Sequence, residues 1–600
     1  MMRLGAWTGF ALLFVPVLTD TDSIRAEPAT SVVLCPAEDA PVSNLSVDFT
    51  LADGSRNVIA LVPAQRPLAS RCRAEAVAAP PGRPLWLGAV STRELARSKS
   101  ITLVRKADDQ RVTGLEIDSA AVRPVSERPL IPRTELLPPR SVRSFGSQER
   151  ITVSEEDSAI ALTCRAGDEV AGAAIELDGA LHPRLKLSLE LEAAGDPGFR
   201  TRIKTATSDI PFAPQHDRQV ARLPIESAPG PLSIVVTCPP TDGRLRLLRA
   251  SVRSAGGGLP DRLATWVWRP ESWRSDRQDL IAWARDQSIA TLFITVAIDG
   301  DRVTDPKGLA DFVAQARKAD IAVVAVEGDP AMIWGGEGRQ QALARARALA
   351  AYQAETPAAR LSGVQYDIEP YNISGFAPDR EGAWRSWAEA LRTLSNELGE
   401  RIDAVVPFWI VEGSGGQDAL TAASPALRQL TIMAYRTEPA AIVAAAAPVL
   451  TWATDHDIPV IVALESGALA HERRDVFQPA DAGELQIVNF GEIAAAILLD
   501  RPIPPLNAMA YRYGHSVESD ASRITFAGQP ARLVSAVRTV AADLAAWPAA
   551  RGIAIHGLAA RNLSVGLKVI RPKTNKSLHD AGHQPCHGAT DWLSKPSLAH

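Results

Sequence analysis

The 600-residue chain has no strong net charge and no long hydrophobic segment. A formal charge of -5 gives no general attraction to nucleic acid. The apolar run at 6–18 is shorter than the roughly 20 residues that a helix needs to cross a bilayer. We therefore expect no nucleic-acid partner and no membrane insertion of the mature chain. The length predicts several domains, and it leaves the oligomeric state undetermined.

The sequence also lacks the motifs of several large enzyme classes. It contains no glycine-rich phosphate loop, no HExxH, no G-x-S-x-G and no C-x-x-C pair. Near the C-terminus, His579, His583, Cys586 and His587 have spacings that a metal could use. A polar, disordered tail over 562–600 is the more common explanation, so we predict no metal site.

The N-terminus has the pattern of a cleaved signal peptide over 1–26. Arg3 precedes the apolar run, and a peptidase could cut after Ala26. The pattern predicts export to the periplasm or the extracellular space, where disulfides persist. Four cysteines allow three connectivities, and the local one pairs Cys35 with Cys72 and Cys164 with Cys238. Buried free thiols are the alternative.

The first part of the chain consists of short alternating or β-branched runs separated by Gly, Pro, Asp and Ser, as at 101–106, 184–192 and 232–238. Such spacing is typical of β-sandwiches. We predict a β-rich module, a Pro- and Arg-rich linker and a β-sandwich module, at 27–123, 124–148 and 149–253.

The second part alternates eight short apolar runs with helix-length segments. The runs lie at 265–268, 291–298, 321–327, 363–369, 403–410, 430–436, 459–465 and 552–558. Eight such repeats predict a TIM barrel over 261–561, with 466–527 inserted as an extra hairpin. The predicted fold class is multidomain: N-terminal β-sandwich module(s) followed by a (β/α)8 TIM barrel.

The fourth run carries two carboxylates. Because side chains alternate across a strand, Gln365, Asp367 and Glu369 share one face, which we expect to point into the barrel mouth. Neighbouring acids raise each other's proton affinity, so Glu369, the outermost, is predicted to stay protonated and act as a general acid. An isolated Asp-x-Glu also occurs by chance on surface strands.

Other residues at the ends of runs fit a sugar cleft, because aromatic faces stack on sugar rings and polar neighbours bind hydroxyls. Each of them taken alone is more often a packing residue. The predicted substrate-binding set is Gln365, Trp268, Glu327, Trp409, Arg436 and His556.

The segment SGVQYDIE at 362–369 resembles the fourth-strand motif of the family 18 glycoside hydrolases, Asp-Gly-x-Asp-x-Asp-x-Glu, with Gln365 replacing an Asp. The resemblance implies that Glu369 protonates the glycosidic oxygen and that Asp367 orients an N-acetyl group of the substrate. Met433-Ala434-Tyr435 resembles the family's sixth-strand motif, which implies that Tyr435 steadies a cyclic intermediate. Arg436 departs from that motif.

A second arrangement resembles the clan A retaining glycosidases, which place the acid on strand four and the nucleophile on strand seven. Glu369 and Glu465 match that layout, so Glu465 is a candidate nucleophile. Glu465 has two alternative roles, binding a sugar hydroxyl or pairing with Arg436.

The sequence thus predicts an exported glycoside hydrolase that acts on a polysaccharide or oligosaccharide without a cofactor. Its predicted catalytic residues are Glu369, Asp367, Tyr435 and Glu465. The alternative is a non-catalytic glycan-binding or polysaccharide-assembly protein on a similar barrel.

Overall fold

The computed structural model describes residues 129–558 except 157–158, 206, 213–218, 226–230, 260–262, 334–335, 373–379, 414, 470–471, 491–492 and 506–507. Before residue 129 it describes strands alone: β1 (Arg3–Leu4), β2 (Ala29–Leu34), β3 (Leu45–Thr50), β4 (Arg56–Leu61), β5 (Arg73–Ala78), β6 (Pro84–Gly88), β7 (Ser98–Lys106) and β8 (Val112–Ser119). The predicted signal peptide beyond β1, the Cys35–Cys72 pair and the predicted tail lie outside the described residues.

A β-sandwich precedes the barrel. Two antiparallel five-stranded sheets pack face to face, with strand orders β10-β11-β18-β13-β16 and β15-β14-β17-β12-β9. Alternate residues such as Leu189 and Leu191 are fully buried between them. The strands are β9 (Ser141–Gly146), β10 (Ile151–Glu156), β11 (Ala159–Cys164), β12 (Ala171–Ala180), β13 (Leu187–Gly195), β14 (Arg200–Lys204), β15 (Asp209–Phe212), β16 (Gln219–Ile225), β17 (Pro231–Thr237) and β18 (Gly243–Ser254).

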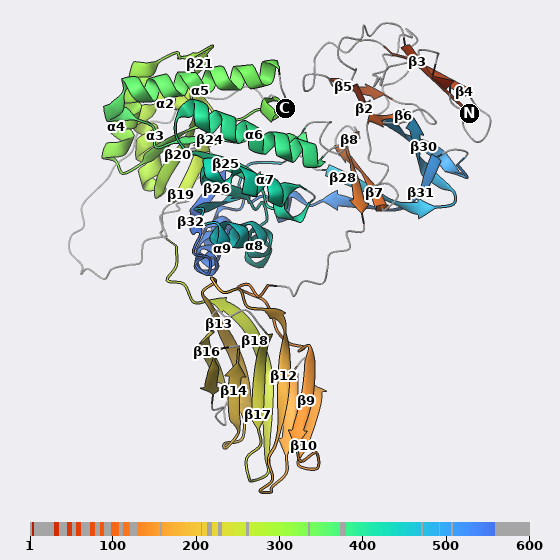
Figure 1. Cartoon of the computed structure of the whole chain (residues 1–600), viewed down its shortest axis with the longest axis vertical. Helices are drawn as coiled ribbons and strands as arrows, with labels where there is room; N and C mark the ends of the chain where they lie inside the picture. The colour runs from red at the N-terminus through yellow and green to blue at the C-terminus, as the bar shows by residue number, and fades with distance from the viewer. Residues whose placement is uncertain are drawn as a thin grey trace, which may run out of the picture.

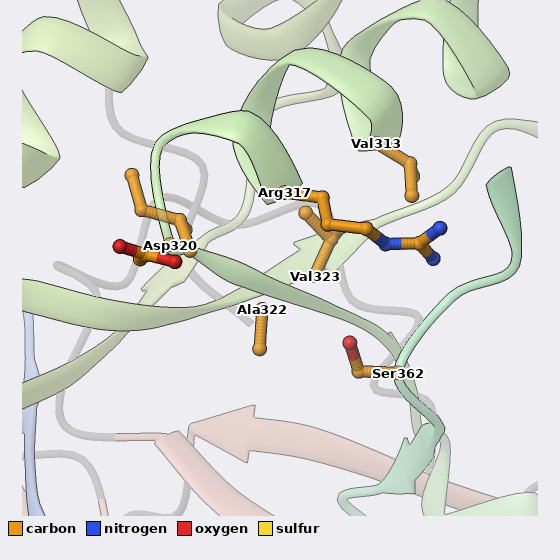
Figure 2. A pocket seen from close by; sticks show the side chains of 7 residues that line it. Val313, Arg317, Asp320, Ala322, Val323 and Ser362 are labelled. Atoms are coloured by element: carbon orange, nitrogen blue, oxygen red, sulfur yellow. The ribbon is translucent and has the colours of Figure 1, made fainter.

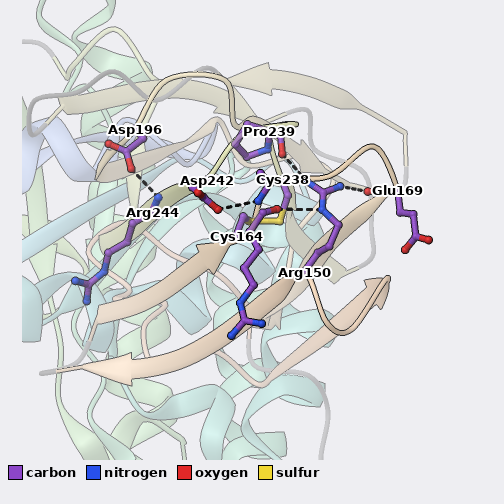
Figure 3. The surroundings of a disulfide bond; sticks show 10 residues. Arg150, Cys164, Glu169, Asp196, Cys238, Pro239, Asp242 and Arg244 are labelled. Carbon is purple, nitrogen blue, oxygen red and sulfur yellow. Dashed lines mark hydrogen bonds between the residues drawn. A yellow bond between two sulfur atoms is a disulfide. The ribbon is translucent and has the colours of Figure 1, made fainter.

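One end of the sandwich is held by a disulfide and a buried arginine (Figure 3). Cys164, which ends β11, is bonded to Cys238, which follows β17, so this predicted disulfide is present. Beside it, Arg150 donates hydrogen bonds to the backbone carbonyls of Arg165 (3.0 Å), Pro239 (2.7 Å) and Glu169. The bond and the arginine together tie the turns at this end to both sheets.

All eight predicted apolar runs form strands of one closed parallel barrel (Figure 1). The strands are β19 (Leu263–Val267), β20 (Ile289–Thr295), β23 (Ala322–Glu327), β24 (Val364–Tyr366), β25 (Ile402–Pro407), β26 (Leu427–Met433), β27 (Val460–Glu465) and β32 (Ala550–His556). A two-stranded ribbon, β21 (Ile298–Asp299) with β22 (Arg302–Val303), follows β20.

Helices lie between successive barrel strands. They are α2 (Pro270–Arg274), α3 (Arg277–Asp286), α4 (Pro306–Lys318), α5 (Glu337–Glu355), α6 (Arg380–Leu398), α7 (Gly416–Ala423), α8 (Pro439–Asp455) and α9 (Pro530–Leu544), with 3-10 turns η1 (Pro330–Ile333), η2 (Pro357–Ala359), η3 (Pro370–Asn372), η4 (Ile410–Glu412), η5 (Ser424–Ala426) and η6 (Ala521–Arg523). Capping side chains and prolines near the first turn help to fix where these helices begin. At α4, for example, the Asp305 side chain accepts a hydrogen bond from the Gly308 amide (2.9 Å), and Pro306 occupies the first turn.

The predicted fold class, β-sandwich module(s) followed by a (β/α)8 TIM barrel, is wrong. The barrel is closed by its eight parallel strands, but within the described part of the chain no helix follows β32, so the eightfold alternation of strand and helix is incomplete. In addition, strands from the first 120 residues do not pair only with one another. They share an antiparallel sheet with the insertion that follows β27.

That sheet has nine strands in the order β5-β2-β6-β30-β29-β31-β28-β7-β8. The insertion contributes four of them, where the sequence predicted one hairpin: β28 (Glu472–Ala480), β29 (Gly483–Phe490), β30 (Ile493–Ile503) and β31 (Ala508–Ser519). β7 pairs with β28 from Ile101 opposite Phe477 to Lys106 opposite Glu472. The insertion therefore joins the N-terminal strands to the barrel.

The sandwich lies on the side of the barrel that carries α8 and α9 (Figure 1). The Lys186 amide donates to the carbonyl of Ala546 just after α9 (2.8 Å), and Arg133 pairs with Asp543 on α9. These contacts hold the sandwich against the outside of the barrel.

Candidate functional site

The carboxyl ends of the barrel strands bring together polar residues from four strands. Asp367 follows β24, Tyr435 follows β26, Glu465 ends β27 and His556 ends β32. One step deeper, Gln365 is fully buried in the barrel interior, where it accepts a hydrogen bond from Trp266 Nε1 (2.9 Å) and donates one to Thr431 Oγ1 (3.1 Å). Both of these bonds are internal to the protein, so Gln365 forms the floor beneath the site.

Asp367 has surroundings unlike those of an ordinary surface acid. Its Oδ1 atom is buried and, within the described residues, has no hydrogen-bond partner. Burial, and then the negative charge of Glu369, raise the pKa of Asp367 to about 7, against a smaller opposing effect of His556. Near neutral pH this carboxyl is therefore protonated in a large fraction of molecules.

Glu369 has the opposite surroundings. Its Oε1 atom accepts a hydrogen bond from the hydroxyl of Tyr371, and its Oε2 atom accepts one from Asn372 Nδ2 (2.7 Å). An ionised carboxylate only accepts hydrogen bonds, so two donors suit the charged form. The ring of Tyr371 packs edge-on against Trp409, with centroids 5.1 Å apart. Trp409 therefore supports Glu369 through Tyr371.

A chain of hydrogen bonds runs along the rim of the barrel from β27 through β32 to β19. His556 Nδ1 lies 2.6 Å from Glu465 Oε2, and Glu465 Oε1 accepts from the Gly467 amide (2.5 Å). On the other side of the ring, Trp268 Nε1 donates to His556 Nε2 (3.1 Å). Trp268 is 45% exposed, which is unusual for a tryptophan and leaves its indole accessible at the mouth.

Tyr435 lies over the same histidine, with ring centroids 6.2 Å apart. Burial is the main cause that holds the pKa of Tyr435 well above the usual range. The charges of three carboxylates add to it, in the order Glu465, Asp367 and Glu369. The Tyr435 hydroxyl therefore stays protonated and can donate a hydrogen bond to a ligand. The negative charges of all three carboxylates therefore act on this phenol.

Two residues of the predicted substrate-binding set point elsewhere. Glu327, at the end of β23, is buried and forms a two-point ion pair with Arg345 on α5, at 2.6 and 2.9 Å. Burial raises its pKa, while the hydrogen bond and charge of Arg345 oppose that effect. The guanidinium of Arg436 lies 4.6 Å from the ring centre of Phe408, and its Nη1 donates to the Tyr435 carbonyl (2.8 Å). The side chain hydrogen-bonded to Glu465 is His556, not Arg436.

Sequence reasoning missed the two residues that hold Glu369. Tyr371 and Asn372 follow it directly, in η3. Their polar side chains at two and three positions after the acid were the available signal, because a turn returns such side chains to the preceding carboxylate.

A pocket elsewhere on the barrel is separate from this site (Figure 2). It lies near the amino ends of β23 and β24, at the opposite end from the carboxylates, and its lining includes Arg317, Asp320 and Ser362. Arg317 donates to the carbonyls of Ala358 (2.7 Å) and Arg360 (2.8 Å), which gives it a structural role there.

Within the described residues, no group of three or more His, Cys, Asp or Glu side chains has an arrangement that could hold a metal ion. The helices of the described part of the chain include none long and apolar enough to span a bilayer.

No protein-family model and no curated protein matches the sequence. Similar solved structures include the CBM22-1 and GH10 modules of Clostridium thermocellum endo-1,4-β-D-xylanase 10B with xylohexaose, at 9% identity and TM-score 0.23 over 54% of this chain and 79% of that chain. The Podospora anserina GH26-CBM35 β-(1,4)-mannanase has 11% identity and TM-score 0.25, over 54% of this chain and 86% of that chain. The module TmCBM61, solved with β-1,4-galactotriose, has 10% identity and TM-score 0.16, over 19% of this chain and 89% of that chain.

These neighbours are glycoside hydrolases and carbohydrate-binding modules. Their identity and TM-scores are too low to carry an argument about the function of this chain.

Proposed function

We propose that the protein is a glycoside hydrolase that cleaves a polysaccharide or oligosaccharide by acid catalysis at the carboxyl end of the parallel barrel. The observation that carries the proposal is the pair of unlike carboxyls after β24. Asp367 has a pKa of about 7, and Glu369 accepts two hydrogen bonds. Two acids whose surroundings differ in this way are the usual requirement for breaking a glycosidic bond.

In the proposed step, Asp367 gives its proton to the glycosidic oxygen as the bond from that oxygen to the anomeric carbon breaks. The charge of Glu369 stabilises the positive charge that develops on the sugar, and Tyr435 donates a hydrogen bond. Water then supplies hydroxide to the anomeric carbon, and its remaining proton restores the acid. The reaction needs no cofactor.

These roles exchange those predicted from the sequence, where Glu369 was the acid and Asp367 its partner. The raised pKa supports Asp367 as the proton donor, because a general acid works best when its pKa is near the working pH. The family 18 assignment and an N-acetylated substrate stay part of the proposal. That assignment carries the original roles, with Glu369 as the acid and Asp367 at the N-acetyl substituent, so it is the alternative to the exchanged roles.

We assign Glu465 a positioning role instead of the nucleophilic one. Its side chain is 4% exposed, and its two oxygens are engaged by His556 and by the Gly467 amide. A nucleophile needs an oxygen directed at the anomeric carbon. Trp268, with its exposed indole, is the proposed stacking surface for a sugar ring.

The test measures release of reducing ends from a panel of bacterial and plant polysaccharides by the full chain. We expect Asp367→Asn to lower the rate by about 10² to 10⁴-fold, the usual contribution of a general acid, and Glu369→Gln to lower it strongly as well. Glu190→Gln, a carboxylate change in the sandwich, is the matched control and should leave the rate unchanged.

Equal release by Asp367→Asn and the unchanged protein would exclude Asp367 as the acid. Binding of a polysaccharide without any release would instead favour the non-catalytic, glycan-binding alternative.

Export through the segment 1–26 also stays part of the proposal. The Cys164–Cys238 disulfide supports it, because such bonds persist in oxidising compartments. N-terminal sequencing of the protein recovered from the periplasm or medium should begin at Glu27. A start at Met1 would contradict the cleavage.

A further inference from the structure

Glu465, His556 and Trp268 are joined by hydrogen bonds that take no part in the proposed proton transfer. Glu465 and His556 lie opposite each other in the pairing of β27 with β32, and β32 pairs with β19 on its other side. The strands themselves therefore place Trp268, which follows β19, next to His556. The two hydrogen bonds of the ring, 2.6 Å to Glu465 and 3.1 Å to Trp268, use both of its nitrogens.

The donors and acceptors of this chain fix the protonation state of the ring. A carboxylate accepts, so Nδ1 of His556 carries the hydrogen that points at Glu465. An indole N–H only donates, so Nε2 must accept from Trp268 through its lone pair. Protonated histidine has a hydrogen on both nitrogens and no lone pair to offer. The observed bond to Trp268 therefore exists only while His556 is neutral.

We infer that His556 and Glu465 are positioning residues that hold the exposed indole of Trp268 in place, and that protonation of His556 releases it. Once Nε2 carries a hydrogen, it repels the indole N–H and becomes a donor for another acceptor at the mouth. The release of Trp268 does not depend on the proposed function. Only its consequence for sugar binding rests on that function.

The groups that face His556 raise the pH at which this change occurs. They are Glu465 from β27, Asp367 and Glu369 after β24, Tyr435 after β26, and Trp266 and Trp268 at β19. Burial lowers the pKa of His556, but the hydrogen bond and charge of Glu465, with the charges of Asp367 and Glu369, outweigh it, so the net pKa is raised. Ionisation of Asp367, whose pKa is about 7, adds a negative charge that favours protonated His556.

The inference has consequences for a sugar ligand. Above the pKa of His556 the indole is held before the ligand arrives, which lowers the entropy lost on binding. Below that pKa the indole must be ordered by the ligand itself. If Trp268 stacks on the substrate, KM should rise as pH falls through the pKa of His556.

The direct test needs no substrate. Tryptophan is labelled with ¹⁵N in the indole ring of the full chain, and the Nε1–H signals are followed by NMR from pH 5 to 9. Trp268→Phe identifies the signal of interest by its loss. We expect the Trp268 signal to move with pH, with its midpoint above about 6.5, the ordinary pKa of histidine. The other indole signals are internal controls.

Two variants separate the proposed cause from other titrations. In His556→Gln the side-chain oxygen can still accept from Trp268, so the signal should no longer titrate with this midpoint. In Glu465→Gln the carboxylate charge is lost, so the midpoint should fall by about one pH unit or more.

A Trp268 signal that stays constant over the whole pH range would overturn the inference. So would a midpoint that both variants leave unchanged. An inactive protein whose Trp268 signal titrates as described would refute the proposed function and leave this inference standing.

Discussion

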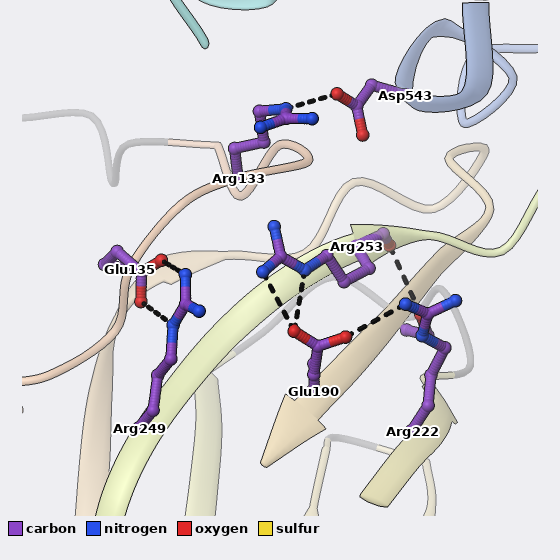
Figure 4. A network of polar contacts seen from close by, with 8 residues as sticks. Arg133, Glu135, Glu190, Arg222, Arg249, Arg253 and Asp543 are labelled. Carbon is purple, nitrogen blue, oxygen red and sulfur yellow. Dashed lines mark hydrogen bonds and ion pairs between the residues drawn. The ribbon is translucent and has the colours of Figure 1, made fainter. Parts of the chain in front are cut away.

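Glu190 in the sandwich and Asp367 in the barrel mouth carry the same chemical group in opposite surroundings. Glu190 accepts hydrogen bonds from Arg253 and Arg222, both at 2.9 Å (Figure 4), and the bond from Arg253 is the main cause that lowers its pKa. Asp367 has no arginine or lysine as an ion-pair partner in the described part of the chain, and its pKa rises to about 7. The comparison separates carboxylates that stabilise the fold from one that destabilises it.

Glu327 stands between these two cases. It is buried like a functional acid, yet Arg345 holds both of its oxygens. A buried carboxylate at a strand end is therefore not sufficient evidence of function. What distinguishes Asp367 is burial with no arginine or lysine paired to it among the described residues.

The largest expected effect on stability comes from Asp367→Asn. The folded-state pKa lies near 7 and the unfolded one near 3.9, so the ionised form is unfavourable in the fold above pH 7 and the penalty disappears below about pH 4. Asparagine removes the charge. We expect the free energy of unfolding of the barrel to rise at pH 8 by at most about 4 kcal/mol, measured by urea unfolding, with no gain at pH 4. A loss of stability at pH 8 would contradict the comparison.

The disulfide belongs to the stabilising side of the comparison. Replacing Cys164 and Cys238 together by serine opens a loop closed across 74 residues, which should lower the free energy of unfolding of the sandwich by about 2 to 4 kcal/mol. Thermal unfolding measures the loss. The catalytic rate of molecules that stay folded should not change, because the bond lies far from the mouth. A lower rate at full stability would show that the two regions are coupled.

Glu327→Gln tests the intermediate case. The variant keeps the volume of the side chain but breaks a charged hydrogen-bonded pair, so we expect the protein to lose about 2 kcal/mol of stability. KM should stay the same, since Glu327 faces α5. Arg345→Gln should have a similar cost, and the double variant should cost less than the sum of the two. A raised KM with unchanged stability would return Glu327 to the substrate-binding set.

The smallest effect is expected for Glu190→Gln. Arg222 is largely exposed, so solvent screens part of the interaction, and the loss at pH 7 should be about 1 kcal/mol. Because the folded-state pKa of Glu190 is lowered, its contribution is present above the unfolded value and is lost as pH falls through the folded one. Urea unfolding should therefore show a larger difference at pH 7 than at pH 3.

The sequence predicted features that depend on neighbouring residues in the chain. Alternation along 363–369 indicated that Gln365 points inward, and it does, because strand geometry is local. The same argument could not be applied to Glu327. Its strand is apolar on both faces, as is usual in a parallel sheet, so the pattern does not reveal which face is the interior.

Features that depend on distant residues were not predictable. The pairing of β7 with β28 joins segments more than 350 residues apart, and no local pattern signals it. The different surroundings of Asp367 and Glu369, on which the proposed exchange of roles rests, were not predicted either. Burial of Asp367 follows from closure of the barrel, and the two donors to Glu369 come from a turn whose shape the sequence pattern leaves open.

The most direct test of the account is the ionisation of Asp367 itself. Aspartate labelled with ¹³C in the side-chain carboxyl gives an NMR signal that shifts when the group loses its proton, and Asp367→Asn identifies the signal by its disappearance. We expect a midpoint near pH 7 in the unliganded protein. A midpoint near 3.9, the ordinary value for aspartate, would show that Asp367 is a common surface acid and would remove the basis of the proposed chemistry.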